Sequence, residues 1–249
     1  MIGKTILRLS ETASTNTFAA KLLLAEKPTE GTVIYSVSQT EGRGQQGNIW
    51  ESECGKNLTV SVILYPCFLK PDKQFLLNKF ISLAVLDFVK LHIPVNMFPK
   101  IKWPNDIYVG AKKVAGILIE NSISGNRFDH VIIGIGININ QEKFSRSIPN
   151  PISLKLLTGK VYDIEYCLKE LCTALDIRYN QLQKEFYNTI DSDYLTNNYR
   201  YKIFSKFRKN DSVIYAEISG ISELGKLQLL DNEGNFSEYA FKEIEYIII

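Results

Sequence analysis

Hydrophobic side chains recur along the chain with two different periods, and each period predicts one kind of element. Helical spacing occurs after Ser14, where Ser14 or Thr15 can cap the helix, and again from Leu76 to Leu91. A further helical segment covers residues 164–190. Alternating or continuous apolar runs predict strands at 6–9, 32–37, 58–64, 101–103, 107–109, 113–120 and 128–139. The strand at 58–64 alternates apolar with polar residues, which predicts that it is half buried.

The pattern changes near residue 205. From there, short strands are divided by the polar turns Asn210-Asp211, Glu223-Leu224-Gly225 and Asp231-Asn232-Glu233-Gly234. This rhythm predicts a small antiparallel barrel of about 45 residues. The chain is therefore expected to have an α+β fold, with a mixed sheet and helices in a domain at 1–204 and the barrel at 205–249.

Composition sets modest limits on function. The 249 residues are 45% hydrophobic and 22% charged, which is ordinary for a soluble globular protein, and the formal net charge of +2 does not indicate a nucleic-acid-binding surface. No apolar run approaches the roughly 18 residues of a membrane span, and no signal-peptide pattern opens the chain. The four cysteines show no metal-ligand spacing, so reduced thiols in the cytoplasm are expected.

The most informative stretch is residues 39–50, which is polar and glycine-rich and ends on Trp50. Three glycines at 42, 44 and 47 leave backbone N–H groups able to surround an anion, and Arg43 adds a planar charged group. The letters also fit the dinucleotide fingerprint G-x-G-x-x-G, but that motif requires a helix directly afterwards, and residues 48–57 have no helical period. A phosphate or acyl-phosphate loop is the better interpretation, and a merely mobile surface loop is the alternative.

A second candidate segment is Lys102-Trp103-Pro104-Asn105-Asp106, followed by Lys112, Lys113 and Gly116. Pro104 makes a turn, and the two strands after it bring the lysines beside that turn. The functional interpretation is a pocket rim for a nucleotide, and the alternative is a hairpin with a solvated lysine pair. Lys113 begins an otherwise apolar strand, so its ammonium could reach a partly desolvated site.

A third segment, Gly134-Ile135-Gly136-Ile137-Asn138, alternates small or polar residues with isoleucine. Its glycines permit close approach of a ligand or of another part of the backbone, and Asn138 can donate and accept hydrogen bonds. A buried structural asparagine is an equally good interpretation of Asn138.

Together these motifs resemble the biotin–protein ligases, most strongly from Ser14 to about Asn140. The resemblance rests on Ser14-Thr15-Asn16, Gln39, Gly42-Arg43-Gly44-x-x-Gly47, Trp50, Lys102-Trp103-Pro104-Asn105-Asp106, Lys113-x-x-Gly116 and Gly134-x-Gly136-x-Asn138. It implies a catalytic domain akin to the class II aminoacyl-tRNA synthetases, followed by a small SH3-like barrel. It also implies a monofunctional form without the DNA-binding domain of some relatives, since the first helix starts near residue 14.

The resemblance implies a two-step reaction. Biotin and ATP, with Mg²⁺, would form biotinyl-AMP, and a lysine of a biotin carboxyl carrier protein or domain would then accept the biotin. No DNA or membrane partner is expected, and a homodimer is possible.

Residue roles are carried over by the same resemblance. Lys113 and Arg43 would be catalytic. Biotin would contact Ser14, Thr15, Asn16, Gln39, Arg43, Gly44, Gln45, Lys113 and Gly116. ATP or the adenylate would contact Arg43, Trp50, Asn105 and Asn138, and Asp106 would help place Mg²⁺ or the lysine.

This chain departs from the family at two places. Gln45 and Gln46 stand where many relatives carry further arginines, and only Lys242-Glu243 matches a Gly-Glu pair near the end. Lipoate–protein ligases share the fold and chemistry, but their arginine-glycine-glycine-glycine loop is missing here. A non-catalytic binding protein on the same fold is the other alternative.

Overall fold

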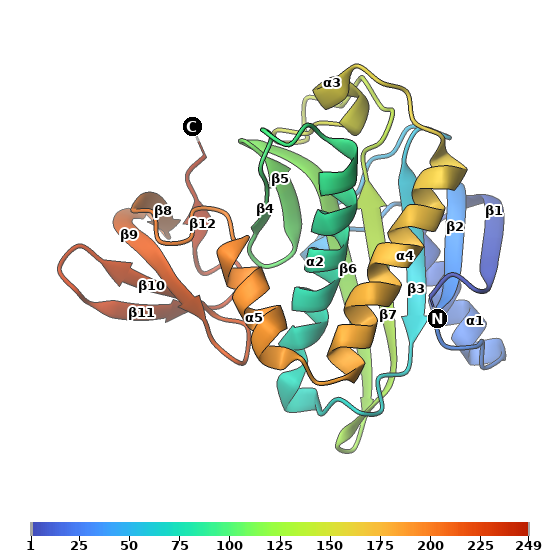
Figure 1. The fold of residues 1–249 in the computed structure, drawn as a ribbon, viewed down its shortest axis with the longest axis horizontal. Coiled ribbons are helices and arrows are strands. Elements are labelled where there is room, and N and C mark those ends of the chain that lie inside the picture. The colour runs from blue at the N-terminus through green and yellow to red at the C-terminus, as the bar shows by residue number, and fades with distance from the viewer. Residues whose placement is uncertain (1, 249) are drawn as a thin grey trace.

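The larger sheet is built from seven strands rich in aliphatic and β-branched residues (Figure 1). The structure, a computed structural model, describes residues 2–248. The strand order is β1-β2-β3-β7-β6-β5-β4; β1 and β2 are parallel and every other neighbouring pair is antiparallel. The strands are β1 (Ile6–Thr12), β2 (Thr32–Gln39), β3 (Leu58–Leu64), β4 (Pro99–Lys102), β5 (Asp106–Val109), β6 (Lys112–Ser124) and β7 (Arg127–Ile137).

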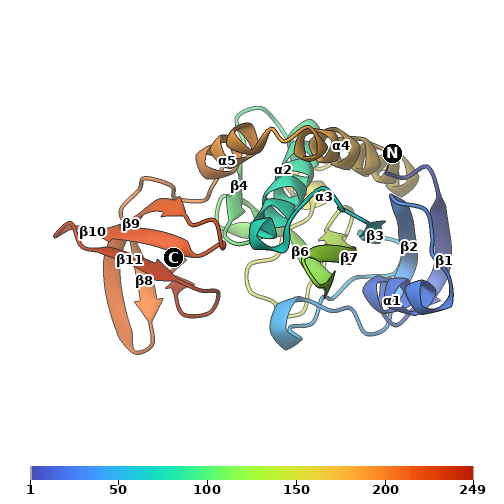
Figure 2. The ribbon, with the colours of Figure 1, turned by 90° about the horizontal axis from the view of Figure 1, so that it is seen from below.

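Helices lie on both faces of this sheet. The helices are α1 (Thr15–Ala25), α2 (Phe75–His92), α3 (Leu154–Thr158), α4 (Ile164–Gln183) and α5 (Tyr187–Thr196), and η1 (Gln45–Gly47) and η2 (Pro71–Lys73) are single 3₁₀ turns. Helices α2, α4 and α5 cover one face, whereas α1 lies against the other (Figure 2). A cavity lined by residues of α1, β6 and β7 lies on this second face.

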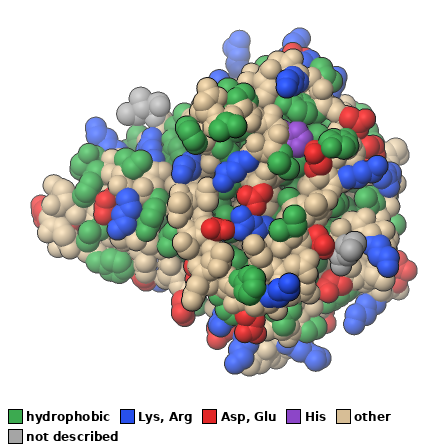
Figure 3. All heavy atoms as spheres, viewed as in Figure 1, with side chains coloured by type: hydrophobic (Ala, Val, Ile, Leu, Met, Phe, Trp, Pro, Cys, Tyr) green, Lys and Arg blue, Asp and Glu red, His purple; other side chains and the backbone are tan. Residues whose placement is uncertain are grey.

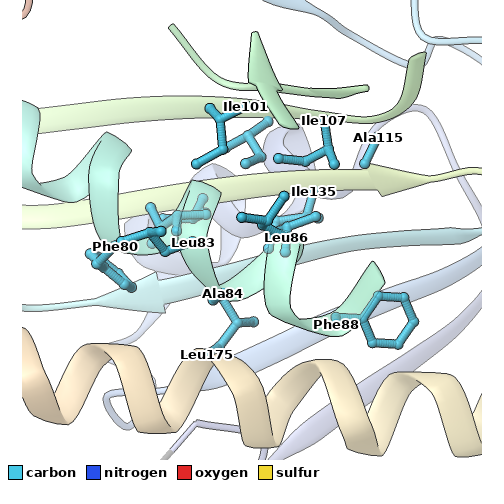
Figure 4. Packing of buried hydrophobic residues seen from close by; sticks show 14 of the residues in the cluster. Phe80, Leu83, Ala84, Leu86, Phe88, Ile101, Ile107, Ala115, Ile135 and Leu175 are labelled. Carbon is cyan, nitrogen blue, oxygen red and sulfur yellow. The ribbon is translucent and has the colours of Figure 1, made fainter. Parts of the chain in front are cut away.

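The main core lies between the sheet and α2. Leu83 and Leu86 of α2 lie toward Ile135 of β7, and Ala84 lies toward Leu175 of α4 (Figure 4). Helix α2 is apolar around most of its circumference because the sheet, α4 and α5 all pack against it. Complete burial of one such leucine contributes about 1.5–3 kcal/mol, so this layer holds the strands of the site in fixed positions.

Two predictions about secondary structure were wrong in detail. The segment predicted as one helix over 164–190 is two helices, because the chain breaks after α4 and Glu185 adopts a positive φ of 58°. The strand predicted to be half buried, β3, is buried at every position. Its polar residues Thr59 and Ser61 are buried because both are hydrogen-bonded within the protein: Thr59 donates to the Ser36 carbonyl oxygen, and Ser61 bonds to Thr15 and Asn16.

The C-terminal segment forms a separate five-stranded antiparallel sheet in the order β11-β10-β9-β8-β12. Its strands are β8 (Ser205–Lys209), β9 (Ser212–Ile221), β10 (Leu227–Asp231), β11 (Phe236–Tyr239) and β12 (Glu245–Tyr246). The closed barrel is not confirmed, because β11 and β12 are the two edges and no ladder joins them among residues 2–248. The division into domains at 1–204 and 205–249 stays a prediction.

The two sheets are in contact through the turn that follows β4. The Trp103 indole donates a hydrogen bond to the Gly225 carbonyl oxygen at 2.9 Å, and its ring centroid lies 6.1 Å from that of Phe241. The smaller sheet thus contacts the same turn that carries Asn105 and Asp106. Within the described chain, no helix is long and apolar enough to cross a membrane.

Candidate active site

Glycines form the floor of the open face. Gly116 of β6 lies opposite Gly136 of β7 in the ladder, and Gly134 comes two residues before Gly136 on the same strand. A Cβ atom at position 136 would lie 2.3 Å from Cε2 of Trp50, and one at position 134 would lie 2.5 Å from Oδ1 of Asn16. Only glycine therefore allows Trp50 and Asn16 to lie directly on the strands, so the close approach predicted for a ligand or for backbone is made here by two side chains.

The first turn of α1 supplies a cluster of hydrogen-bonding groups beside this floor. Ser14, Thr15 and Asn16 are all buried, and Ser14 begins the helix without using its side chain as a cap. The Thr15 backbone N–H donates to Oε1 of Gln39 at 2.8 Å, and the Ser61 hydroxyl lies 2.6 Å from Oδ1 of Asn16 and 2.7 Å from Oγ1 of Thr15. Donors and acceptors are thus held in fixed directions within a small space, which is what recognition of a polar ring requires.

The glycine-rich loop closes on itself without forming a helix. The Gly44 N–H donates to the Asn48 carbonyl oxygen at 2.7 Å, and the Trp50 N–H donates to that of Gly42 at 2.9 Å. Between them lies only the short turn η1. The absence of a helix after the glycines at 42–47 confirms that the dinucleotide-binding interpretation was rightly set aside.

Arg43 extends from this loop to Glu120 on β6. Its Nη2 lies 3.0 Å from Oε1 of Glu120, and the other carboxylate oxygen accepts a hydrogen bond from Nδ2 of Asn16 at 2.7 Å. Half of the Arg43 side chain is exposed, so this ion pair contributes about 1 kcal/mol or less. Glu120 therefore links the loop to α1 weakly.

Lys113 and Asp106 form the charged centre of the opposite wall. Lys113 Nζ lies 2.7 Å from Oδ1 of Asp106 and 5.8 Å from the centroid of the Trp50 ring. Their side chains are 28% and 24% exposed, so the pair is only partly desolvated. Burial lowers the pKa of the nearby Lys102, and the carboxylate of Asp106 opposes that change.

Asn105 and Asn138 are both buried and both use their amide groups to hold backbone. Nδ2 of Asn105 donates to the Ile117 carbonyl oxygen, and Nδ2 of Asn138 donates to that of Ile152 at 3.1 Å. Asn138 is thus a buried asparagine that holds backbone, as one of its two interpretations from the sequence predicted.

The predicted residues meet in one place. A cavity of about 300 Å³ is lined by all but one of them, namely Ser14, Thr15, Asn16, Gln39, Arg43, Gly44, Gln45, Trp50, Asn105, Asp106, Lys113 and Gly116. Asn138 instead lines an adjoining cavity of about 300 Å³, which shares Trp50 and Lys113 with the first. The predicted residues therefore line two neighbouring cavities, and Pro149 and Phe241 from later in the chain also line the first of them.

Sequence reasoning did not identify Glu120 or Ser61, which do not line the cavity but form hydrogen bonds with residues that do. Glu120 follows Gly116 by four positions on one strand, so the alternation of side chains places both on the same face. A charged residue at that position of an otherwise apolar strand was the available signal. The sequence around Ser61 was less informative, because alternating serine and valine also fits a strand with one solvent-exposed face.

The indole nitrogen of Trp50, which lines both cavities, lacks a hydrogen-bond partner in the described part of the chain. Nε1 is buried and has no hydrogen-bond partner among residues 2–248. A buried donor without a partner costs about 1–3 kcal/mol. A ligand acceptor reaching this nitrogen would recover that free energy.

Comparison with known proteins agrees with this geometry. The family model described as "Biotin/lipoate A/B protein ligase family" matches residues 9–138. The bifunctional ligase/repressor BirA of Bacillus subtilis is 29% identical over 241 residues, which cover 94% of this chain and 72% of the relative. The biotin–[acetyl-CoA-carboxylase] ligase of Paracoccus denitrificans is 31% identical over 173 residues, which cover 67% of this chain and 69% of the relative.

Solved structures give the same result. The biotin protein ligase from Aquifex aeolicus in complex with biotin and ATP aligns with a TM-score of 0.80 and 26% identity, covering 99% of this chain and 100% of that one. The match includes the glycine loop, the α1 cluster and the lysine strand within one family region. The chain belongs to the biotin/lipoate A/B protein ligase family.

Proposed function

We propose that this protein is an ATP-dependent biotin–protein ligase, which activates biotin as biotinyl-AMP and transfers it to a lysine of a biotin carboxyl carrier protein. Both the relatives named as biotin ligases and the solved ligase bound to biotin and ATP support this function. The observation that carries it is the single cavity in which Lys113 and Arg43 meet the α1 cluster on a glycine floor.

The α1 cluster is suited to the ureido ring of biotin. Ser14, Thr15, Asn16 and Gln39 present hydroxyl and amide groups that can donate to the ring carbonyl and accept from its two N–H groups. Lipoate has a disulfide ring with no such groups, and burying these residues against it would leave them unpaired. The lipoate alternative is therefore less well supported.

Activation requires charge stabilisation at the other end of the cavity. A carboxylate oxygen of biotin attacks the α-phosphorus of ATP, and the bond from that phosphorus to the bridging oxygen breaks as pyrophosphate leaves. Lys113 and Arg43 both line the cavity, and in this proposal Lys113 would stabilise the negative charge of the phosphoryl oxygens while Arg43 would add a second cation from the loop. Positioning of the two substrates supplies much of the remaining acceleration.

Transfer uses the same wall of the cavity. The neutral amine of the carrier lysine attacks the acyl carbon of the adenylate, and the bond to the AMP oxygen breaks as an amide forms. The amine loses its proton to solvent or to a nearby acceptor, and Lys113 stabilises the leaving phosphate charge.

The nucleotide would occupy the side of Trp50 where the two cavities meet. Trp50, Asn105 and Asn138 line this region, and the unpaired indole N–H of Trp50 supports an acceptor there. Asp106 would offer Mg²⁺ one carboxylate oxygen, the kind of ligand that magnesium takes beside nucleotide phosphates. Mg²⁺ would neutralise phosphate charge, while Asp106 also orients Lys113.

The remaining expectations belong to this proposal as well. The four cysteines are free thiols, which supports a cytoplasmic protein. The SH3-like character of the C-terminal sheet and a possible homodimer stay predictions. Folding of the loop over the adenylate would exclude water from a reactive anhydride.

The test is pyrophosphate release from ATP and Mg²⁺ with biotin or lipoate as the acid. Biotin should support turnover, and a biotinylated lysine should appear only when a carrier domain is added. Equal turnover with lipoate would contradict the substrate assignment. Release with neither acid would favour a binding protein on the same fold.

A further inference from the structure

A second group of chemically active side chains lies on the helix-covered face, away from the glycine floor. His92 ends α2, and Cys167 and Glu170 are three residues apart near the start of α4, where they share one helix face. His92 Nε2 lies 3.7 Å from Sγ of Cys167 and 3.0 Å from Oε2 of Glu170. All three ligand atoms lie within 4.8 Å of one another.

We propose that His92, Cys167 and Glu170 bind a thiolate-seeking divalent cation of the Zn²⁺ class. Nitrogen, sulfur and carboxylate oxygen together form a donor set that zinc accepts and that Mg²⁺ or Ca²⁺ does not favour. Tetrahedral zinc with its usual bond lengths separates sulfur from nitrogen by roughly 3.6 Å. The separation of 3.7 Å between Sγ and Nε2 is close to that spacing, whereas the 3.0 Å between Nε2 and Oε2 of Glu170 is an ion-pair distance that would lengthen by a few tenths of an ångström when the metal binds.

The histidine has a partner on its other ring nitrogen, as metal-binding histidines do. Nδ1 lies 2.9 Å from the Phe88 carbonyl oxygen, and a proton on Nδ1 donated to that oxygen would leave Nε2 to bind the metal. The Tyr162 hydroxyl donates to the His92 carbonyl oxygen at 2.8 Å, which fixes the end of the helix. The contact of Nδ1 with the Phe88 carbonyl oxygen is the kind of support that metal-binding histidines normally have.

Glu170 has a buried carboxylate oxygen that lacks a hydrogen bond in the part of the chain that the structure describes. Its Oε2 is buried and, despite the short distance to Nε2, makes no hydrogen bond among the described residues. A cation between the two atoms would satisfy both. The Glu170 side chain is 26% exposed, so ions can enter from that side and water can occupy a fourth position.

The same three residue types also occur in cysteine-nucleophile sites, but this thiol is poorly suited to that role. Cys167 is almost fully buried, and burial raises the pKa of its thiol to about 12, with the Glu170 carboxylate acting in the same direction. On metal binding the thiol proton passes to the buffer and a sulfur–metal bond forms. A bound cation would provide the positive charge that stabilises a thiolate at this buried position.

The cation would connect two helices that pack on the core. Helices α2 and α4 make extensive contact, and the proposed ligands lie where α2 ends and α4 begins. Binding to the folded chain alone would raise its stability in proportion to the free metal concentration. The function of the site is thus structural and separate from the biotin cavity.

The test is a titration of the full-length, chelator-treated protein with Co²⁺, followed by displacement with Zn²⁺. One equivalent of Co²⁺ should produce a thiolate-to-metal charge-transfer band, and Zn²⁺ should remove that band and raise the thermal midpoint of unfolding. Cys167→Ser should abolish the band, and Cys172→Ser, on the same helix, should retain it. His92→Gln and Glu170→Gln should each weaken binding by at least about tenfold, comparable to the loss of a supporting partner.

His130→Gln is the matched control, because His130 is the second of the two histidines in the chain and should not affect binding. A folded wild-type protein without a charge-transfer band would overturn the proposal, as would a band that persists in Cys167→Ser. If Cys167→Ser does not fold, the comparison of Glu170→Gln with His130→Gln decides. Equal affinity in those two variants would then refute the site.

Discussion

Replacement of Lys113 by alanine is the sharpest test of the proposed chemistry. The ammonium interacts with charge that develops on the phosphoryl oxygens as the anhydride forms or breaks, so its loss should slow adenylation far more than it weakens biotin binding. The adenylation rate is measured by pyrophosphate release, and biotin affinity by calorimetry in the absence of ATP.

The magnitude follows from the exposure of the site. Loss of one preorganised charge-stabilising donor lowers rates by about 100- to 1,000-fold, or about 2.7–4 kcal/mol. Lys113 is 28% exposed, so water partly screens it and the lower limit of about 100-fold is expected. Removing its ion pair with the partly exposed Asp106 should cost about 1 kcal/mol of folding stability or less, too little to unfold the protein.

Lys112→Ala is the matched control. Lys112 is the preceding residue of β6, is exposed, and does not line either cavity. Its replacement should leave adenylation within about twofold of the wild type, since it makes no contact with the site. Similar small effects from both lysines would refute the catalytic role and restore the interpretation of a solvated hairpin.

Three further outcomes are expected from the same geometry. Biotin or its adenylate should protect residues 41–48 from protease, and unchanged cleavage at saturating ligand would show that the loop is no lid. Gly136→Ala should displace Trp50, because the new Cβ would lie 2.3 Å from its ring. Urea unfolding should show a free energy of unfolding lower by about 1–3 kcal/mol, and the rate of pyrophosphate release should also fall. Asp191→Ala should lower the free energy of unfolding by about 1–3 kcal/mol, because it leaves the buried Lys79 ammonium without its carboxylate at 2.8 Å. Lys79→Met should cost less, since no charge is left unpaired.

Local patterns predicted the parts of the site that depend on local geometry. The start of the first helix at Ser14, the glycines at 42–47 and the turn at 103–106 were recognisable because each is a short run with its own stereochemical requirement, although the Ser14 side chain makes no capping hydrogen bond. The apolar period of α2 was equally clear. These features do not require knowledge of which strands pair.

Residues that act through pairing were harder to predict. Glu120 joins Asn16 and Arg43, which lie 104 and 77 positions away in sequence. Its role depends on tertiary packing, which brings α1 and the loop at 39–50 to the same face of β6. The break between α4 and α5 was missed for a similar reason, since Glu185 adopts its positive φ without any glycine or proline nearby to indicate it.

The links around Glu120 also explain how a loop can be ordered here and still serve as a lid. Arg43 is fixed to the sheet chiefly by one half-exposed ion pair, and such pairs contribute about 1 kcal/mol or less. A phosphate offers Arg43 more negative charge and a geometry for two parallel hydrogen bonds. The adenylate can therefore replace Glu120 as the partner of Arg43 at little cost. Under the proposed closure of the loop over the adenylate, this one arginine would supply most of the electrostatic attraction, because the glutamines at 45 and 46 add no charge.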